Sequence, residues 1–201
     1  AWERFTAKGP LALLPLGDLD GQHRAALVWT QPADQAEAVL QLPDAAFLAR
    51  LEGEFGNKLG PFIRVGKRAL YPLNLSVASE QIRPGLVLLG NVAHTLHPVA
   101  GQGFNLALRD TIALAASTRS AIAAGDSPGS FSQLQRYLDH VRADQLSTID
   151  FSHYMTRLFS SRQPALTWLR QWGMASLDLA SPLRHSLGQK AMGYHQPRVQ
   201  L

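Results

Sequence analysis

One stretch of the chain combines a short apolar run, a glycine-rich loop and the start of a long helix. From Gly85 to Asp110 it reads GLVLLGNVAHTLHPVAGQGFNLALRD. The apolar run ends at Gly90-Asn91 and is followed by two histidines, a proline and Gly-Gln-Gly. Such a run is typical of a strand buried on both faces. The stretch therefore predicts a strand–loop–helix unit in a fold of the α+β or α/β class.

The loop and the helix start suit a planar ligand with a polar edge. Gly101 and Gly103 remove side chains, so the main chain can lie against a flat or anionic group. The free N–H groups and the positive dipole end of the helix then face that group, and Asn105 adds an amide. Spacing alone leaves an ordinary strand–loop–helix connection equally open, because Leu106 stands where G-x-G-x-x-G needs its third glycine.

The sequence divides by texture into residues 1–81, 82–125 and 126–201. The middle part carries the strand at 86–90 and a helix from about 103 to 124 that is apolar nearly all round. The last part is helical. Its first helix has the apolar residues Phe131, Leu134, Leu138, Val141, Ile149, Met155 and Phe159 on one stripe, and a second helix starts at Gln163-Pro164.

The first part has the pattern of strands with one helical insert. Turn signals at Gly17-Asp18 and Asp20-Gly21 predict an antiparallel hairpin between two apolar runs. Helical spacing of apolar residues predicts a helix over 43–55, closed by Gly56. The runs at 62–79 predict a second strand pair, and Pro72 favours an edge or bulged position there.

Composition excludes several classes of protein. Apolar residues make up 46% of the chain and charged residues 17%, so a globular protein with a sparsely charged surface is expected, which is compatible with burial against another domain, a partner or a lipid surface. The net charge of +4 is scattered, so nucleic acid is not an expected partner. The absence of cysteine excludes disulfides and thiolate metal sites. The apolar stretches are too short for a transmembrane helix.

Two histidines in the loop raise the question of a metal site. His94 and His97 are three residues apart in a loop with a proline and no acidic partner nearby in the sequence. This is poor geometry for metal ligands. We expect no metal here and interpret both histidines as residues that pack the loop.

The whole string closely resembles the second FAD-binding motif of the class A flavoprotein aromatic hydroxylases, G-D-A-A-H-x-x-x-P-x-x-G-Q-G-x-N. The residues in register are Gly90, Ala93, His94, Pro98, Gly101, Gln102, Gly103 and Asn105. Asn91 departs from the Asp that most of the family has. The flanks ERFTAKGPLALLPL and GKRALYPLNL resemble the 2-polyprenyl-6-methoxyphenol hydroxylase branch, which acts in ubiquinone biosynthesis.

The resemblance implies a place for the chain in a larger fold. It indicates the C-terminal part of a two-domain flavoprotein similar to para-hydroxybenzoate hydroxylase. Residues 1–81 would form the mainly antiparallel substrate-domain sheet with one helix, 82–125 the C-terminal part of the FAD-binding domain, and 126–201 a C-terminal helical region. Since the family's N-terminal βαβ unit with G-x-G-x-x-G does not occur in the sequence, we expect a fragment that binds FAD weakly or not at all and is inactive alone.

The activity that the resemblance implies is hydroxylation of a polyprenyl-phenol ring in ubiquinone biosynthesis. FAD, NAD(P)H and O2 would react through a flavin C4a-hydroperoxide, and no proton-transfer residue is implied. Asn91, next to Gly90, would face the ribityl chain, and Pro98 would lie beside the isoalloxazine. The backbone facing the pyrimidine edge, where the helix dipole stabilises negative charge, would be that of Gly101, Gln102, Gly103, Phe104 and Asn105.

Two groups of apolar residues invite a substrate or lipid role. Tyr71 and Leu73 come from a predicted strand that would wall the substrate cavity in this family, and plain sheet core is the alternative. A stripe in the last helix suits either a membrane surface and a polyprenyl substrate or helix packing. Its residues are Trp168, Leu169, Trp172 and Leu177.

From this branch of the family we expect a cytoplasmic protein in peripheral contact with the inner membrane. A homo-oligomer and a quinone-biosynthesis complex are the expected associations. Two alternatives remain open. One is a class A hydroxylase that acts at another ring position, and the other is a non-catalytic lipid-binding or assembly subunit of a quinone-synthesis complex.

Overall fold

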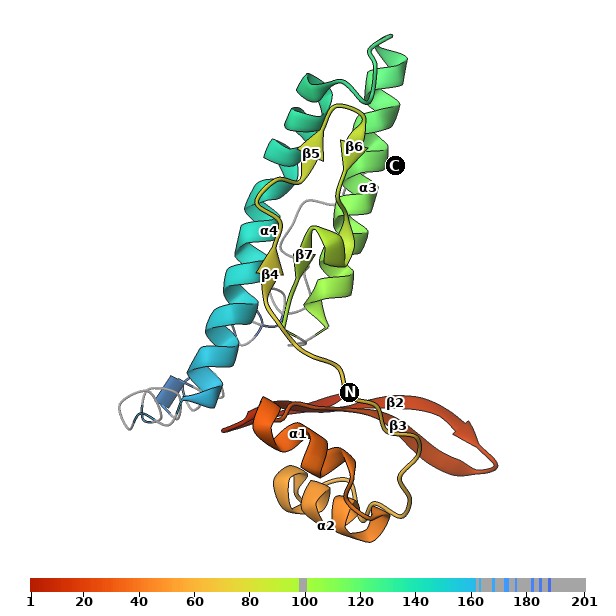
Figure 1. Cartoon of the computed structure of the whole chain (residues 1–201), viewed down its shortest axis with the longest axis vertical. Helices are drawn as coiled ribbons and strands as arrows, with labels where there is room; N and C mark the ends of the chain where they lie inside the picture. Colours follow the sequence, from red (N-terminus) through yellow and green to blue (C-terminus); the bar gives the residue numbers. More distant parts are fainter. Residues whose placement is uncertain are drawn as a thin grey trace. The chain divides into compact units, whose positions relative to one another are not determined.

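The structure, a computed structural model, describes residues 1–97 and 101–161 and, beyond them, the single positions 163, 168, 172, 173, 176, 182, 185 and 188. Its contacts form two compact units. The first comprises Ala1–Leu73 with Thr156–Thr167, and the second comprises Asn74–Met155 with Trp168–Leu201. Both helices and strands occur, so the mixed α and β class is confirmed (Figure 1). The boundaries expected at 81/82 and 125/126 stay predictions.

A three-stranded antiparallel sheet forms the base of the first unit. Its strands, in spatial order, are β1 (Trp2–Thr6), β2 (Gly9–Leu19) and β3 (Gln22–Trp29). Leu19 pairs with Gln22 across a two-residue turn in which Asp20 and Gly21 have φ angles of 52° and 73°. Positive φ at both central residues matches the twist of a tight hairpin. The predicted hairpin is confirmed, with its turn at Asp20-Gly21.

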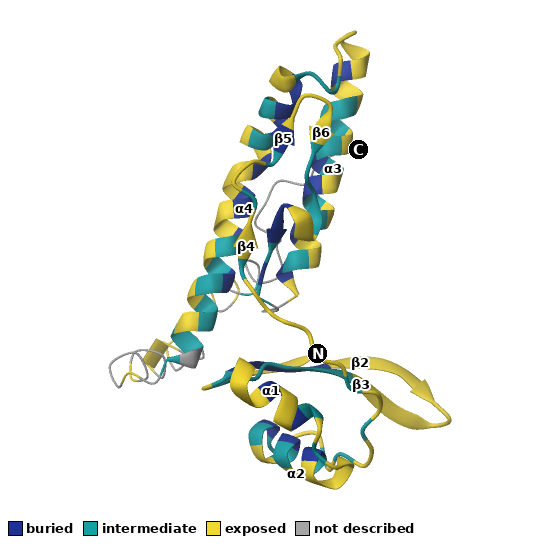
Figure 2. Ribbon diagram, in the orientation of Figure 1, coloured by how far each residue is buried: buried dark blue, intermediate teal, exposed yellow. Residues whose placement is uncertain are grey.

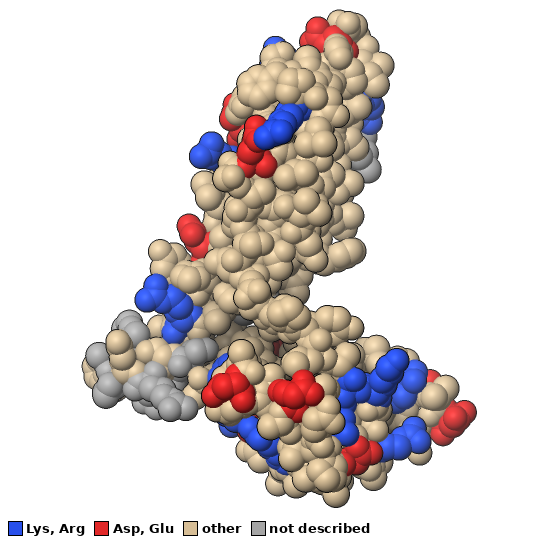
Figure 3. Space-filling view, in the orientation of Figure 1, with Lys and Arg blue, Asp and Glu red and all other residues tan. Residues whose placement is uncertain are grey.

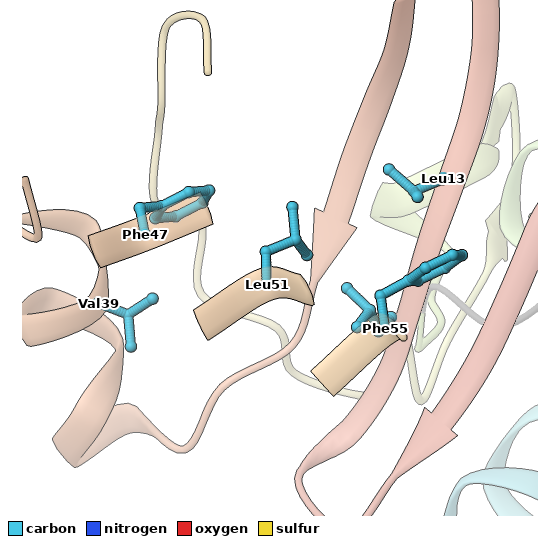
Figure 4. Packing of buried hydrophobic residues seen from close by; sticks show 6 residues of the cluster. Leu13, Val39, Phe47, Leu51 and Phe55 are labelled. Atoms are coloured by element: carbon cyan, nitrogen blue, oxygen red, sulfur yellow. The ribbon is translucent and has the colours of Figure 1, made fainter. Parts of the chain in front are cut away.

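Two helices pack on this sheet. They are α1 (Ala33–Leu40) and α2 (Asp44–Phe55). The core contains Leu13 of the sheet and Val39 of α1 (Figure 4). From α2 it contains Phe47, Leu51 and Phe55, each four residues after the last. The predicted helix over 43–55 is therefore confirmed, and Gly56 ends it with a φ of 85°. The single helical insert was wrong, because α1 precedes it. Only Ala36 and Val39 of α1 are buried, and one spacing of three residues is too little to define a helical period.

The strand pair expected over 62–79 is wrong except at its end. Only β4 (Ser76–Val77) is a strand in this range. Side chains, rather than a backbone ladder, attach the segment to the helices. The Phe62 amide donates to Glu52 Oε1 at 2.7 Å, and Arg68 donates to the Leu42 carbonyl at 2.7 Å and to Asp44 at 2.9 Å. The segment is thus bonded to α2 and to the residues just before it, and not to an edge of the sheet formed by β1, β2 and β3.

The second unit combines short strands with two long helices that run alongside each other (Figure 1). Its other elements are β5 (Ile82–Arg83), β6 (Leu86–Val87), the short 3-10 helix η1 (Gly90–Val92), β7 (His94–Thr95), α3 (Gln102–Ala123) and α4 (Phe131–Ser160). β4 pairs with β7, and β5 pairs with β6, both antiparallel. Ala113 of α3 packs on Tyr137 and Val141 of α4, and Val87 and Leu89 close this core. Figure 2 shows the buried residues concentrated between α3, α4 and the strands.

The expected strand at 86–90, buried on both faces, is wrong. Gly85, with a φ of 76°, turns the chain so that Leu86–Val87 pairs back on Ile82–Arg83. Leu86 is 50% exposed, and Gly90 already belongs to η1. The Pro-Gly turn itself is as predicted. Its local geometry produces a hairpin, and within the described residues no parallel strand lies beside it.

Both long helices agree with the sequence pattern in extent. α3 ends within one residue of the expected position, and α4 is continuous. The apolar stripe of α4 is only partly confirmed, because Phe131 is 54% exposed and the buried face beyond Val141 is polar. The helix expected after Gln163 falls mainly outside the described residues. Within the described part of the chain, no helix is long and apolar enough to cross a membrane.

Charged side chains are unevenly spread. On the face drawn in Figure 3, the middle of the second unit is largely without Lys, Arg, Asp or Glu, whereas such residues are frequent over the first unit. On this face, the few charged residues of the sequence therefore leave part of the surface uncharged. An uncharged face of this kind is typical of a surface that contacts another molecule or domain.

Candidate functional site

The predicted ligand loop begins at η1, which packs on α3. Gly90 has a φ of 63°, in the left-handed region that side chains with a Cβ rarely adopt. A Cβ at this position would lie 3.7 Å from Ala107 Cβ, which is ordinary van der Waals distance. The backbone conformation, rather than lack of space, therefore requires glycine here. Asn91 follows with its side chain exposed, and its carbonyl accepts a hydrogen bond from the Thr95 hydroxyl at 2.9 Å.

The N-terminus of α3 is open. Gly101 precedes the helix with φ 62° and ψ 22°, and no side chain caps the first turn. No atom of the described residues outside its chain neighbours lies within 4 Å of the place where a Cβ of Gly101 would be. At Gly103 a Cβ would meet only Leu96, at 3.9 Å. Gly101, the residue before the first turn, thus offers no side chain to cap the helix, and neither glycine adds a side chain that would screen the helix start.

The remaining predicted site residues divide between surface and interior. Phe104 is 76% exposed and Asn105 is also exposed, whereas Gln102 is buried at 3% exposure. Gln102 therefore supports the loop from inside. Pro98, expected beside a flavin ring, lies outside the described residues.

A buried polar cluster lies behind the loop. His94 Nε2 is 2.9 Å from Asp110 Oδ2, and the exposed fractions of the two side chains are 0% and 1%. Gln145 Nε2 of α4 donates to the same Asp110 oxygen at 2.9 Å. This arrangement places the proton of His94 on Nε2, where it is donated to the carboxylate. The cluster thus connects β7, α3 and α4 through one carboxylate oxygen.

Three buried atoms at this cluster have no hydrogen-bond partner among the described residues. They are His94 Nδ1, Asp110 Oδ1 and the Tyr137 hydroxyl. Burial, and then the negative charge of Asp110, raise the pKa of Tyr137 above its ordinary value of 10.0. The hydroxyl therefore stays protonated at any physiological pH. Unpaired buried groups are costly, so their presence marks a site that is not optimised for stability alone.

α4 also bonds to α3 and to the residue that ends the described part before the loop. Arg109 donates to the two carboxylate oxygens of Asp144 at 2.6 and 3.2 Å. Ser152 donates to the His97 carbonyl at 3.3 Å. Burial, and then the positive charge of nearby His153, lower the pKa of His97 below its ordinary value of 6.5. His97 is therefore neutral at neutral pH.

Comparison with known proteins decides the family. Residues 1–128 match a protein family described as "FAD binding domain". The chain belongs to this FAD-binding domain family. Among curated relatives it is 36% identical to the ubiquinone hydroxylase UbiL of Rhodospirillum rubrum over 204 residues, which cover 99% of this chain and 47% of that protein.

Two further relatives of this FAD-binding domain carry related names. It is 31% identical to the 3-demethoxyubiquinol 3-hydroxylase of Escherichia coli, over 96% of this chain and 48% of that protein. It is 29% identical to the mitochondrial ubiquinone biosynthesis monooxygenase COQ6 of Homo sapiens, over 93% of this chain and 46% of that protein. The chain spans about half the length of the curated relatives that it matches.

The residues of this FAD-binding domain fit a flavin edge at the start of α3. Flavin is planar, and its pyrimidine edge presents acceptors that gain negative charge on reduction. Gly101 has no side chain at the helix N-terminus, where the backbone N–H groups and the helix dipole favour such charge. Gly103 adds no side chain, and exposed Phe104 and Asn105 complete the rim. The donor set therefore suits an acceptor edge.

Sequence reasoning missed the buried cluster of this domain. Asp110 follows Leu106 by four residues and precedes Ala113 by three, so it lies on the buried face of α3. A charged residue on an apolar face requires a buried partner. The acidic partner that His94 lacked nearby in the sequence is Asp110, on the following helix. Among the described residues, no group of three or more His, Cys, Asp and Glu side chains could hold a metal ion.

The two predicted substrate residues are not in a strand. Tyr71 and Leu73 lie in irregular structure of the first unit and are 75% and 43% exposed. Both the strand and the sheet-core alternative are therefore wrong for them, because their segment is attached through side chains instead of a ladder. Their contact with a substrate stays a prediction.

The tryptophan pair in the last segment is also exposed. Trp168 and Trp172 are 63% and 59% exposed, with ring centroids 5.7 Å apart. Helix packing is therefore not supported for these two side chains. Leu169 and Leu177 of the same predicted stripe lie outside the described residues.

Proposed function

We propose that this protein is an FAD-dependent monooxygenase that hydroxylates a polyprenyl-phenol ring in ubiquinone biosynthesis. The single observation that carries the proposal is the open, glycine-flanked N-terminus of α3 in a member of the FAD-binding domain family. The names of the relatives, a ubiquinone hydroxylase and a 3-demethoxyubiquinol 3-hydroxylase, support the substrate class. The proposed overall architecture is a two-domain flavoprotein.

The loop residues have distinct proposed roles. The backbone of residues 101–105 binds the pyrimidine edge and stabilises negative charge there through its N–H groups and the helix dipole. Gly90 lets η1 lie close to the ribityl chain, and the Asn91 amide bonds a ribityl hydroxyl. Pro98 flanks the ring. Bound FAD, reduced by NAD(P)H, supplies the O2 chemistry, and the residues of the chain orient the ring and exclude water from it.

Contact with a membrane surface forms part of the proposal. A polyprenyl substrate partitions into lipid, so the enzyme has to reach the bilayer from outside. Exposed Trp168 and Trp172 support such contact, because indole rings favour the membrane–water interface. We propose peripheral attachment to the inner membrane from the cytoplasm, in a quinone-biosynthesis complex or as a homo-oligomer.

The decisive experiment uses the complete gene product. Purified protein is incubated with NADH or NADPH, isotopically labelled O2 and each of several prenyl-phenols that differ in the ring position open to hydroxylation. The expected result is bound flavin and a product that carries one labelled oxygen atom. Mass spectrometry of the product also identifies the ring position.

Two outcomes contradict the proposal. Oxygen derived from water instead of O2 excludes a monooxygenase. Protein that binds prenyl-phenol or lipid but neither binds flavin nor oxidises NAD(P)H is instead a lipid-binding or assembly subunit.

A further inference from the structure

One hydrogen bond closes the chain around the proposed flavin edge. His94 precedes the segment that leads to Gly101, and Asp110 follows the first turns of α3. The bond between their side chains, 2.9 Å from Nε2 to Oδ2, joins the two ends of a loop that contains the whole glycine segment. Such a cross-link reduces the number of conformations open to the enclosed chain.

A second helix holds the same loop from behind. Gln145 of α4 donates to the Asp110 oxygen that also receives the His94 proton, at 2.9 Å. Seven residues further along α4, Ser152 donates to the His97 carbonyl at 3.3 Å. α4 therefore bonds the chain once on each side of Gly101. A shift of the loop relative to α4 would break at least one of these bonds.

The cluster is buried, so its bonds cannot be exchanged for bonds to water. His94 and Asp110 are 0% and 1% exposed. Removing one partner leaves an unpaired polar group or charge inside the protein, which makes alternative loop positions unfavourable. A buried polar network of this kind contributes little net stability, but it selects one arrangement of the elements that it joins.

We infer that His94, Asp110 and Gln145 are positioning residues that hold the N-terminus of α3 in the place required by the flavin edge. The inference rests on the proposed function, since that function names what is positioned. The three residues act through the backbone of β7 and of the first turns of α3. They carry no proton or electron in the reaction.

The first test measures hydrogen exchange in the FAD-free full-length protein. In His94→Leu, which cannot donate to Asp110, the amides of residues 106–110, the first in α3 with intrahelical acceptors, exchange at least about tenfold faster than in wild type, because the loop is no longer tied to α3. His94→Gln keeps an N–H donor and restores slow exchange. Arg109→Met is the matched control, because it removes the neighbouring ion pair between α3 and α4 but leaves β7 bonded to Asp110.

The second test follows the cofactor. Titration with FAD gives a dissociation constant about tenfold higher for His94→Leu than for Arg109→Met. The flavin midpoint potential of the reconstituted protein also shifts in His94→Leu and not in Arg109→Met. A purely structural role changes the unfolding midpoint of both variants and moves neither the potential nor the visible spectrum of the flavin. If His94→Leu does not fold, Gln145→Leu takes its place, because it removes only one donor to Asp110. It is expected to raise the FAD dissociation constant and to shift the flavin midpoint potential in the same way.

The inference and the proposed function fail in different ways. If wild-type protein binds no FAD, the proposed function fails, and the inference with it. If wild-type protein binds FAD, the inference alone is overturned by equal hydrogen exchange, FAD affinity and potential in His94→Leu and Arg109→Met. Failure of His94→Gln to restore slow exchange also overturns it.

Discussion

His94 donates from Nε2 to Asp110 Oδ2 across 2.9 Å, and neither side chain is more than 1% exposed. The pair joins a two-residue strand to the middle of a long helix. A buried carboxylate is tolerated only where donors satisfy it, and Gln145 supplies the second donor. The position of α3 relative to β7 is thus determined by polar contacts as well as by packing.

Removal of the Asp110 carboxylate should strongly destabilise the protein. Asp110→Leu leaves the His94 and Gln145 donors buried and unpaired, so we expect a loss of about 3–5 kcal/mol in the free energy of unfolding. Asp110→Asn keeps an acceptor oxygen and should lose less, about 1–3 kcal/mol. Urea unfolding followed by circular dichroism measures both. A loss below about 1 kcal/mol for Asp110→Leu would contradict the buried pair.

The two loop glycines should respond in opposite ways to substitution in the absence of flavin. Gly101→Ala places a side chain at a φ of 62° and should cost about 1–2 kcal/mol of stability. Gly103→Ala lies within the helix and should gain up to about 1 kcal/mol, because its Cβ meets only Leu96 at 3.9 Å. In the full-length protein both should weaken FAD binding. Unchanged FAD affinity in Gly103→Ala would disprove the proposed approach of the backbone to the flavin.

Two neighbours on α3 separate packing from cofactor contact. Leu106 is 0% exposed, so Leu106→Ala should cost about 2–5 kcal/mol in unfolding free energy. Phe104 is 76% exposed, so Phe104→Ala should change stability by no more than about 0.5 kcal/mol. If Phe104 contacts flavin, its substitution lowers FAD affinity all the same. Thermal unfolding of the FAD-free protein and FAD titration measure the two effects separately.

The titration of His97 should make stability depend on pH. Its pKa in the folded protein lies below 6.5, first because of burial and then because of His153, so the unfolded chain binds the proton more readily. The unfolding free energy should therefore fall as the pH decreases through 6.5 and level off below the folded pKa. His97→Asn should flatten this part of the profile, and His153→Asn should flatten it partly. An unchanged profile in His97→Asn would rule out this origin.

Exposed tryptophans should bind lipid. Replacing Trp168 and Trp172 by serine should lower the affinity for phosphatidylcholine–phosphatidylglycerol vesicles about tenfold, because two indole rings no longer enter the interface. The unfolding midpoint should not change, since both rings are exposed. Tyr154→Ser is the control, because Tyr154 is 63% exposed on α4. Equal vesicle binding by wild type and the double variant in cosedimentation would exclude the contact.

The elements that depend on interactions between residues close in sequence could be predicted from the sequence. The Asp20-Gly21 turn, the helix ended by Gly56 and the extents of α3 and α4 follow from backbone preference and apolar period, which act within a few residues. The glycines at 101 and 103 likewise predict a helix start that is free of side chains at these two positions, and no atom of the described residues outside its chain neighbours lies within 4 Å of a Cβ placed at Gly101. Contact of this helix start with a ligand stays a prediction.

Elements that need a distant partner could not be derived in the same way. The composition of the run at 86–89 suits a buried parallel strand and a hairpin strand equally well. In the structure Leu86–Val87 pairs with Ile82–Arg83, so the run forms a hairpin. Residues 62–73 have strand-like composition, but side-chain bonds attach the segment to α2 and it pairs with no strand. Because β pairing depends on which backbone is nearby, the sequence of the segment alone does not specify it.

The residue types needed for a ligand edge at the start of α3 were therefore readable from the sequence alone. Only the tertiary structure revealed that His94, Asp110 and Gln145, which are far apart along the chain, meet at one carboxylate oxygen. The physical reason is that burial makes an isolated charge so unfavourable that its partners must come from whatever elements pack around it. The partners of Asp110 come from β7 and α4, and the packing of the unit selects them.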